Sequence, residues 1–303
     1  MKSTYPIISF FFVLCLFSCA SESSTNASES TKKTANVSKT PQSVSLEKLW
    51  SSSEGFVTPE SVIYDEKNGI YYVSNVNLNP WEKDGNGFIS KMDTFGTITE
   101  LKWVEDGIHG PKGMAIVGNK LYATDIDELL EIDIATGNIT GRFGVTPGSM
   151  LNDITVGANG DLYVSASGAN LIYRKKGHGF LPLTEKLAFS PNGVDYQNGQ
   201  LNVLGFDSKK MYKFDLVDNS ESTFSSELGA ADGLEQVEEG GYLASDWNGQ
   251  VFYVDPTGKN QLLINTIEEK KGAADIEYVS SRKTLLVPTF FDNHIDAYKV
   301  NIK

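Results

Sequence analysis

The feature that most constrains the fold is a pattern that recurs along the chain from residue 60 onward. Each copy joins two short apolar segments through a tight turn, as in residues 60–64 and 70–74. The copies begin at Glu60, Gly113, Asn152, Asn192, Asp232 and Asp275. Their starts are separated by 53, 39, 40, 40 and 43 positions. A chain with such a period must stack similar units side by side, because one unit cannot bury its apolar face alone.

The segments within each copy read as short β-strands. They are rich in Val, Ile, Leu and Tyr, end at Gly, Asn or Asp, and number four in most copies. Four short strands every 40 or so residues are typical of a β-propeller blade. The last copy has three segments, and residues 45–50 precede the first copy. We therefore expect an all-β, six-bladed β-propeller over residues 45–303, with four-stranded blades and the ring closed by the N-terminal strand.

The composition indicates a folded domain with an affinity for cations. Hydrophobic residues make up 40% of the 303 residues, enough to build a large core. With 26 basic and 39 acidic residues the formal net charge is −13, so we expect no nucleic-acid partner. Three histidines and two cysteines exclude a Cys/His zinc site, whereas a site of oxygen ligands for a hard cation remains open.

The N-terminus has the pattern of a bacterial lipoprotein. A basic start and an apolar run lead to residues 16–19, which resemble a lipobox ending at the lipidated Cys19. We expect a lipoprotein signal peptide over 1–18, then Cys19 and a disordered Ser/Thr-rich tether over 19–44. This predicts a protein of the bacterial cell envelope, at the outer membrane or periplasmic face, anchored to the membrane by lipid alone. An ordinary signal peptide with an incidental cysteine is the alternative.

The residues that open the copies should meet near one mouth of the central channel, because each opens an innermost strand. Carboxylates so close together repel one another unless a cation or protons intervene. Calcium takes six to eight oxygen ligands from carboxylates, amide carbonyls and water. The pattern therefore indicates a calcium site, and the alternative is a set of polar residues lining a solvated tunnel.

At these residues the chain resembles the regucalcin, gluconolactonase and luciferin-regenerating-enzyme family. Paraoxonases and squid-type diisopropylfluorophosphatase are more distant six-bladed relatives. The matching stretches are Pro59-Glu60-Ser61, Leu151-Asn152-Asp153, residues 190–195 and Ala231-Asp232-Gly233-Leu234. The resemblance covers essentially all of residues 45–303. It implies a catalytic divalent metal, usually calcium, held by Glu60, Asn152, Asn192 and Asp232.

The resemblance also implies a reaction, the hydrolysis of a lactone or related ester with the metal as Lewis acid. Asp232 would be both a metal ligand and the nucleophile or general base. Asp153, Glu235 and Asp275 form a candidate second metal site deeper in the channel. Ser61 stands where paraoxonases place an acid, which is a departure from their second site.

Loops at the mouth supply further candidates. Residues 75–87 form a long insertion that contains Trp81 and could act as a substrate lid, and Phe291 and Trp247 complete the predicted pocket. His109 and His294 are candidate catalytic residues that titrate near neutrality, or else bystanders in surface loops. The bland interpretation of Trp247 is packing within a blade turn.

Lys112 occupies the position at which the blade-two histidine of paraoxonases would align, so a dyad like theirs is not evident.

Two classes of function fit these features. The first is a calcium-dependent, gluconolactonase-like hydrolase that acts on a small-molecule substrate as a monomer. The alternative is a non-catalytic propeller that binds a ligand or protein at the same mouth, with a structural cation. The complete Glu/Asn/Asn/Asp set favours catalysis, whereas the sequence identifies no second catalytic group. A carbon–nitrogen condensing enzyme of the strictosidine-synthase type shares the fold but lacks the metal ring, so it ranks last.

Overall fold

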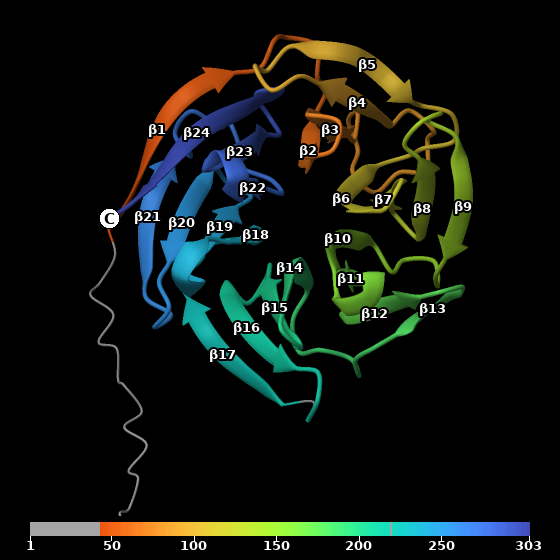
Figure 1. Ribbon diagram of the computed structural model, residues 1–303. Helices are drawn as coiled ribbons and strands as arrows, with labels where there is room; N and C mark the ends of the chain where they lie inside the picture. Colours follow the sequence, from red (N-terminus) through yellow and green to blue (C-terminus); the bar gives the residue numbers. More distant parts are fainter. Residues whose placement is uncertain (1–42, 219) are drawn as a thin grey trace, which may run out of the picture. The chain divides into compact units, whose positions relative to one another are not determined.

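Residues 43–218 and 220–303, which the computed structural model describes, form six four-stranded antiparallel sheets around a common axis (Figure 1). The predicted all-β, six-bladed propeller is therefore confirmed. The predicted signal peptide, Cys19 and the tether as far as residue 42 lie outside the described residues.

In the first three blades the strands follow chain order from the axis to the rim. Blade 1 contains β2 (Pro59–Asp65), β3 (Ile70–Asn75), β4 (Phe88–Met92) and β5 (Ile98–Val104). Blade 2 contains β6 (Pro111–Val117), β7 (Lys120–Asp125), β8 (Glu128–Asp133) and β9 (Ile139–Gly144). Blade 3 contains β10 (Leu151–Val156), β11 (Leu162–Ala166), β12 (Leu171–Lys176) and β13 (Gly179–Pro182).

The next two blades repeat this arrangement, and the sixth takes its outer strand from the start of the domain. Blade 4 contains β14 (Pro191–Gln197), β15 (Gln200–Gly205), β16 (Lys210–Asp215) and β17 (Glu221–Ser226). Blade 5 contains β18 (Ala231–Gln236), β19 (Tyr242–Asp246), β20 (Gln250–Val254) and β21 (Asn260–Asn265). Blade 6 contains β22 (Glu277–Val279), β23 (Thr284–Thr289), β24 (His294–Ile302) and β1 (Val44–Ser51).

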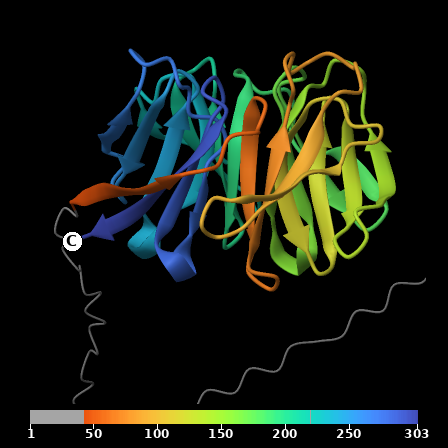
Figure 2. The same cartoon turned by 90° about the horizontal axis from the view of Figure 1, so that it is seen from above.

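The ring closes through the antiparallel pairing of β1 with β24, which runs from Val44 opposite Ile302 to Ser51 opposite Asp296. Figure 2 shows these two strands, orange-red and dark blue, side by side near the C-terminus. Both oxygens of Asp296 are engaged, one by Lys48 Nζ at 2.8 Å and one by Ser51 Oγ at 2.6 Å. The predicted closure by the N-terminal strand is confirmed, and it gives the last blade its fourth strand.

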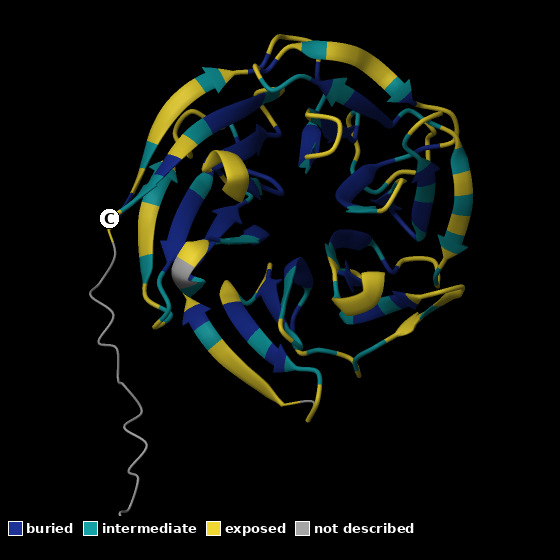
Figure 3. Ribbon diagram, viewed as in Figure 1, coloured by how far each residue is buried: buried dark blue, intermediate teal, exposed yellow. Residues whose placement is uncertain are grey.

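Apolar cores lie between neighbouring blades. Tyr72, Tyr122 and Tyr163 occupy the same position in successive second strands, and each packs into a core shared with the following blade. Figure 3 shows the consequence: the inner strands are buried, whereas the outermost strands are largely exposed. The strand nearest the axis is thereby fixed in position, which allows it to hold functional side chains rigidly.

Helical structure in the described part of the chain is limited to three single 3-10 turns. They are η1 (Ala158–Gly160), η2 (Glu238–Gly240) and η3 (Ser280–Arg282). None of the described helices is long and apolar enough to cross a membrane.

Candidate functional site

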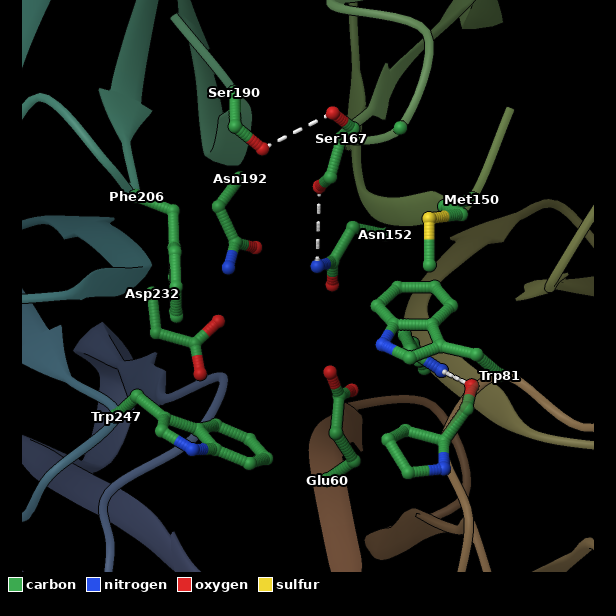
Figure 4. A pocket seen from close by; sticks show the side chains of 13 residues that line it. Glu60, Trp81, Met150, Asn152, Ser167, Ser190, Asn192, Phe206, Asp232 and Trp247 are labelled. Atoms are coloured by element: carbon green, nitrogen blue, oxygen red, sulfur yellow. Dashed lines mark hydrogen bonds between the residues drawn. The ribbon is translucent and has the colours of Figure 1, made fainter. Parts of the chain in front are cut away.

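A cavity of about 320 Å³ lies at the end of the channel where the inner strands begin (Figure 4). Its volume falls at the lower end of the range for small-molecule sites. The cavity is lined by Glu60, Pro80, Trp81, Lys112, Met150, Asn152, Ser167, Gly168, Ser190, Asn192, Phe206, Asp232 and Trp247.

Irregular pairing at the start of the inner strands positions the polar residues of this cavity. In the first five blades the register between the first and second strands shifts there, for example between Leu151 and Ile154. A bulge of this kind releases residues from the ladder and re-aims their side chains. Hydroxyls from the second strands satisfy the freed backbone: Ser165 Oγ accepts from Asp153 N at 2.9 Å, and Ser245 Oγ from Gly233 N at 2.7 Å.

Glycines next to the ring residues allow the inner strands to approach one another closely. A Cβ at Gly193 would lie 2.2 Å from the carbonyl oxygen of Asp232, and a Cβ at Gly233 only 2.4 Å from Ile276 N. A side chain at either position would therefore force adjacent blades apart. The Asn-Gly and Asp-Gly dipeptides of blades 4 and 5 each combine a polar ring residue with this close contact.

The four predicted metal ligands, Glu60, Asn152, Asn192 and Asp232, all line the cavity and point toward one another (Figure 4). All four are buried. Asn152 Nδ2 donates to Ser167 Oγ at 3.3 Å, which fixes the orientation of its amide. Glu60 Oε2, Asn192 Oδ1 and Asp232 Oδ2 have no hydrogen-bond partner among residues 43–218 and 220–303. The site thus presents buried oxygen acceptors without donors, which is the chemistry that a hard cation requires.

The electrostatics of the site agree with this donor set. Burial is the main cause that raises the pKa of Glu60 and of Asp232 well above the usual range, and the neighbouring Asp275 raises both further. Lys112 acts in the opposite direction on both carboxyl groups. Burial thus favours the uncharged form of both carboxyl groups, and a bound cation would favour the charged form.

Acidic side chains alone do not make a metal site in the described residues. No three His, Cys, Asp or Glu side chains within that part of the chain lie close enough to hold an ion. The candidate set at the mouth differs because two of its four members are amides, and calcium accepts amide oxygens as well as carboxylates.

Lys112 is the ring residue that the sequence interpretation missed. It takes the place in blade 2 that we assigned to Gly113, and its ammonium is buried, donating to the carbonyls of Pro80 at 2.7 Å and Gly110 at 3.0 Å. Its Nζ also lies 4.1 Å from the ring centroid of Trp81. Burial lowers the pKa of Lys112, whereas Glu60 and other nearby carboxylates raise it.

A sequence signal for Lys112 was present. A proline precedes the ring residue in three inner strands, as Pro59, Pro111 and Pro191. Alignment on this proline places Lys112, and not Gly113, in register with Glu60 and Asn192.

Asp275 also lies one step deeper than predicted. It forms a parallel bridge with Ser61, so that the residue of blade 6 in register with Glu60 is Ala274. The prediction that all six leading residues meet at the mouth is therefore wrong for Gly113 and Asp275.

The other mouth candidates divide into two groups. Trp81 and Trp247 line the cavity. Phe291, also predicted for the pocket, is not among the described lining residues but packs edge-on against Trp247 with ring centroids 5.4 Å apart. His109 and His294 are not among the described residues that line it. His109 Nδ1 accepts from Gly85 N at 3.0 Å, and His294 Nδ1 lies 2.6 Å from the carbonyl oxygen of Asp292. Neither imidazole is therefore part of the cavity wall in the described chain.

A second cavity of about 380 Å³ lies further along the inner strands, and Asp153, Glu235 and Asp275 contribute to its wall with Asp195 and Glu277. Burial raises the pKa of Asp275 and of Glu277 to about 7. Asp153 already accepts hydrogen bonds on both oxygens, from Ile154 N and Val194 N. The three carboxyls predicted to form a second metal site are therefore not a cluster that could hold an ion by itself in the described chain.

Comparisons with known proteins extend the fold assignment. No protein-family model matches the chain, and no curated protein matches it by sequence. A streptogramin B lyase structure superposes with a TM-score of 0.64 at 16% identity, covering 86% of this chain and 98% of that one. The structure of a gluconolactonase-like protein superposes with a TM-score of 0.66 at 15% identity, covering 86% of this chain and 93% of that one. A third structure is a catalytically inactive His-to-Ala variant of virginiamycin B lyase from Staphylococcus aureus with quinupristin. It superposes with a TM-score of 0.60 at 14% identity, covering 85% of this chain and 99% of that one. These likenesses are likenesses of fold.

Proposed function

We propose that this protein is a divalent-cation-dependent hydrolase of a lactone or related ester, with calcium as the cation. The observation that carries the proposal is the group of buried oxygens on Glu60, Asn192 and Asp232, which lack partners within the described residues. Leaving a buried polar atom unpaired costs about 1–3 kcal/mol. A cation held by these three residues and Asn152 would offset that cost.

The chemistry of such a site suits ester hydrolysis. A divalent cation, when bound, polarises the ester carbonyl and makes water more acidic. We assign Asp232 as the general base, because its carboxylate points into the cavity and its Oδ2 is free of protein donors in the described chain. The Asp232 carboxylate takes a proton from a water molecule as the oxygen of that water bonds to the carbonyl carbon of the ester. The proton then passes to the ester oxygen as the carbon–oxygen bond breaks, giving an acid and an alcohol.

Lys112 has an electrostatic part in this proposal. Its buried ammonium lowers the repulsion between Glu60 and Asp232, since it is a cation beside both carboxyl groups. Its hydrogen bonds to two backbone carbonyls hold it in place without using a ring oxygen.

The named neighbours support an enzyme of the propeller class, and one feature favours a hydrolase over a lyase. The virginiamycin B lyase is catalytically inactive when one histidine is replaced by alanine. In the described residues of the present chain, no histidine lines the cavity. A reaction that uses a carboxylate base therefore fits the site better than one that depends on an imidazole.

The lack of a histidine in the described cavity wall is also consistent with the non-catalytic alternative. A ligand-binding propeller with a structural cation needs only the ring and its walls, and no second titrating group. The two functions differ in turnover and not in cation binding, so one experiment can separate them.

The test is a thermal melt with and without calcium, combined with hydrolysis of a panel of lactones. We expect calcium to raise Tm, and Asn192→Ala to abolish both that increase and hydrolysis. Asn119→Ala, which removes an exposed amide remote from the cavity, should leave both unchanged. A Tm that does not change with calcium would contradict the cation hypothesis. Calcium binding without hydrolysis of any lactone in the panel would favour a non-catalytic, ligand-binding propeller.

A further inference from the structure

The polar side chains around the cavity are largely committed to partners. Ser167 Oγ donates to the carbonyl of Pro191 at 2.7 Å and accepts from Asn152, and Ser190 Oγ donates to the carbonyl of Ser167 at 3.0 Å. Lys112 donates to two carbonyls. Apart from the indole N–H groups of Trp81 and Trp247, the remaining polar groups of the wall belong to the four proposed cation ligands. The cavity therefore offers little to pair with several hydroxyl groups of a ligand.

Apolar groups make up the rest of the wall. Trp81 and Trp247 lie on opposite sides of the cavity with Glu60 between them (Figure 4). Pro80, Met150 and Phe206 fill the remaining wall. A polar floor is thus surrounded by large flat or flexible apolar side chains.

Both indoles contact neighbouring side chains that restrict their positions. Trp247 packs against Phe290 at 4.5 Å and Phe291 at 5.4 Å between ring centroids, and Phe290 is itself buried. Trp81 is held by the ammonium of Lys112 over its ring and by the hydrogen bond from Lys112 to the carbonyl of Pro80. Aromatic side chains fixed in this way present rigid faces to a ligand at little entropic cost.

Met150 adds a strained element to the same wall. Its backbone has φ of 53°, a left-handed conformation that is uncommon for a residue other than glycine. Hydrogen bonds to Asp127 Oδ1 and from Ser167 N hold it there. Strain of this kind is retained where a functional site requires a particular side-chain position.

An indole face can stack on an arene or on the C–H face of a sugar, so hydrogen bonding decides between them. A sugar lactone entering this cavity would lose its hydrogen bonds to water at several hydroxyls without replacing them, which weakens its binding. A flat apolar group loses no such hydrogen bonds and gains contact with both walls.

We infer that the substrate carries a flat apolar group, such as an aromatic ring fused to the lactone or attached to the ester, and that polyhydroxylated sugar lactones are poor substrates. The inference rests on the proposed hydrolase function for its reaction, but its claim about ligand shape has a separate test. The reacting carbonyl lies over the polar floor, and the apolar group lies between Trp81 and Trp247.

Two six-membered lactones test this directly, dihydrocoumarin with a fused benzene ring and gluconolactone with its hydroxyls. We expect kcat/KM to be at least about tenfold higher for dihydrocoumarin, and Trp81→Ala to lower that preference about tenfold. Trp103→Ala, which removes an indole outside the cavity, is the matched control. Calorimetry with the lactam analogue of dihydrocoumarin measures binding without hydrolysis.

The outcomes separate the two claims. A preference for gluconolactone, or a dihydrocoumarin preference that Trp81→Ala leaves intact, would overturn the inference while the hydrolase stands. Lactam binding that is lost in Trp81→Ala without hydrolysis of either lactone would support the ligand class and overturn the hydrolase. If neither lactone reacts and the lactam does not bind, both claims fail.

Discussion

Two rows of polar residues line the same channel and differ in how their oxygens are used. The mouth row contains Asn152 and Asp232, and the deeper row contains Asp153 and Asp275. Burial raises the pKa of all three aspartates above the usual range. By burial and charge alone, the two rows are hard to distinguish.

Hydrogen bonding separates them. Asp153 accepts from Ile154 N at 2.6 Å and from Val194 N at 2.7 Å, which ties blade 3 to blade 4. Asp275 accepts from Ser61 Oγ at 2.7 Å and ties blade 6 to blade 1. Asp232 Oδ2 finds no such donor within the described chain. The carboxylates of Asp153 and Asp275 hold blades together, whereas Asp232, although hydrogen-bonded to Asn192, keeps one oxygen available to a ligand.

Replacing Asp232 by Asn should give the largest effect on this comparison. We expect Asp232→Asn to lower lactone hydrolysis by roughly 10³-fold, because the general base is lost. The increase in Tm with calcium should also disappear. The Tm measured with a chelator present should stay the same or rise, because the substitution removes a buried carboxyl group with an unpaired oxygen. Lactone-hydrolysis assays measure the loss of activity, and thermal melts with and without calcium measure the change in Tm. Retained activity would exclude Asp232 as the base.

The second prediction concerns pH and the deeper row. The pKa of Asp275 is about 7 in the folded protein and about 4 in an unfolded chain, so the folded state retains a proton that the unfolded state has released. Stability in chelator should therefore fall as pH rises from about 4 to 7, by about 3 kcal/mol for this group. Denaturant unfolding across this range measures the slope.

Asp275→Asn should flatten that slope, and Asp84→Asn on an exposed loop should leave it unchanged. An unaltered slope in Asp275→Asn would assign the pH dependence to other carboxyls.

The smallest effect is expected at Asp153, and it should be purely structural. In Asp153→Asn the side-chain NH₂ group must face one of the two backbone N–H donors, which should cost about 2 kcal/mol and lower Tm by roughly 5 °C. The increase in Tm with calcium should remain. Melts of Asp153→Asn beside Asp232→Asn make a matched pair of Asp-to-Asn changes. If Asp153→Asn also abolished the increase in Tm with calcium, the proposal that only the mouth row binds the cation would be contradicted.

The fold was predictable from sequence because strand content repeats at a nearly constant period. The apolar segments 60–64 and 70–74 alone suggest a hairpin, and their recurrence requires a ring of blades. The short last copy and the unassigned segment 45–50 then pointed to β1 as the closing strand, which pairs with β24 as expected.

The candidate site was only partly predictable, for two physical reasons. Bulges at the start of the inner strands shift the register by one residue, so an alignment on strand content confused Gly113 with Lys112 and placed Asp275 one step too far toward the mouth. Loop paths carry no period, so nothing in the repeat indicates that His109 and His294 are not among the residues that line the cavity.

The pairing of β1 with β24 also orders events in time. β1 is the first strand of the domain to be synthesised and β24 the last, so β1 has no partner until the rest of the ring exists. Contacts between such distant parts of a chain form slowly. Blade 6 is therefore the place where folding ends, and until that moment the two edges of the unfinished ring remain open to other chains.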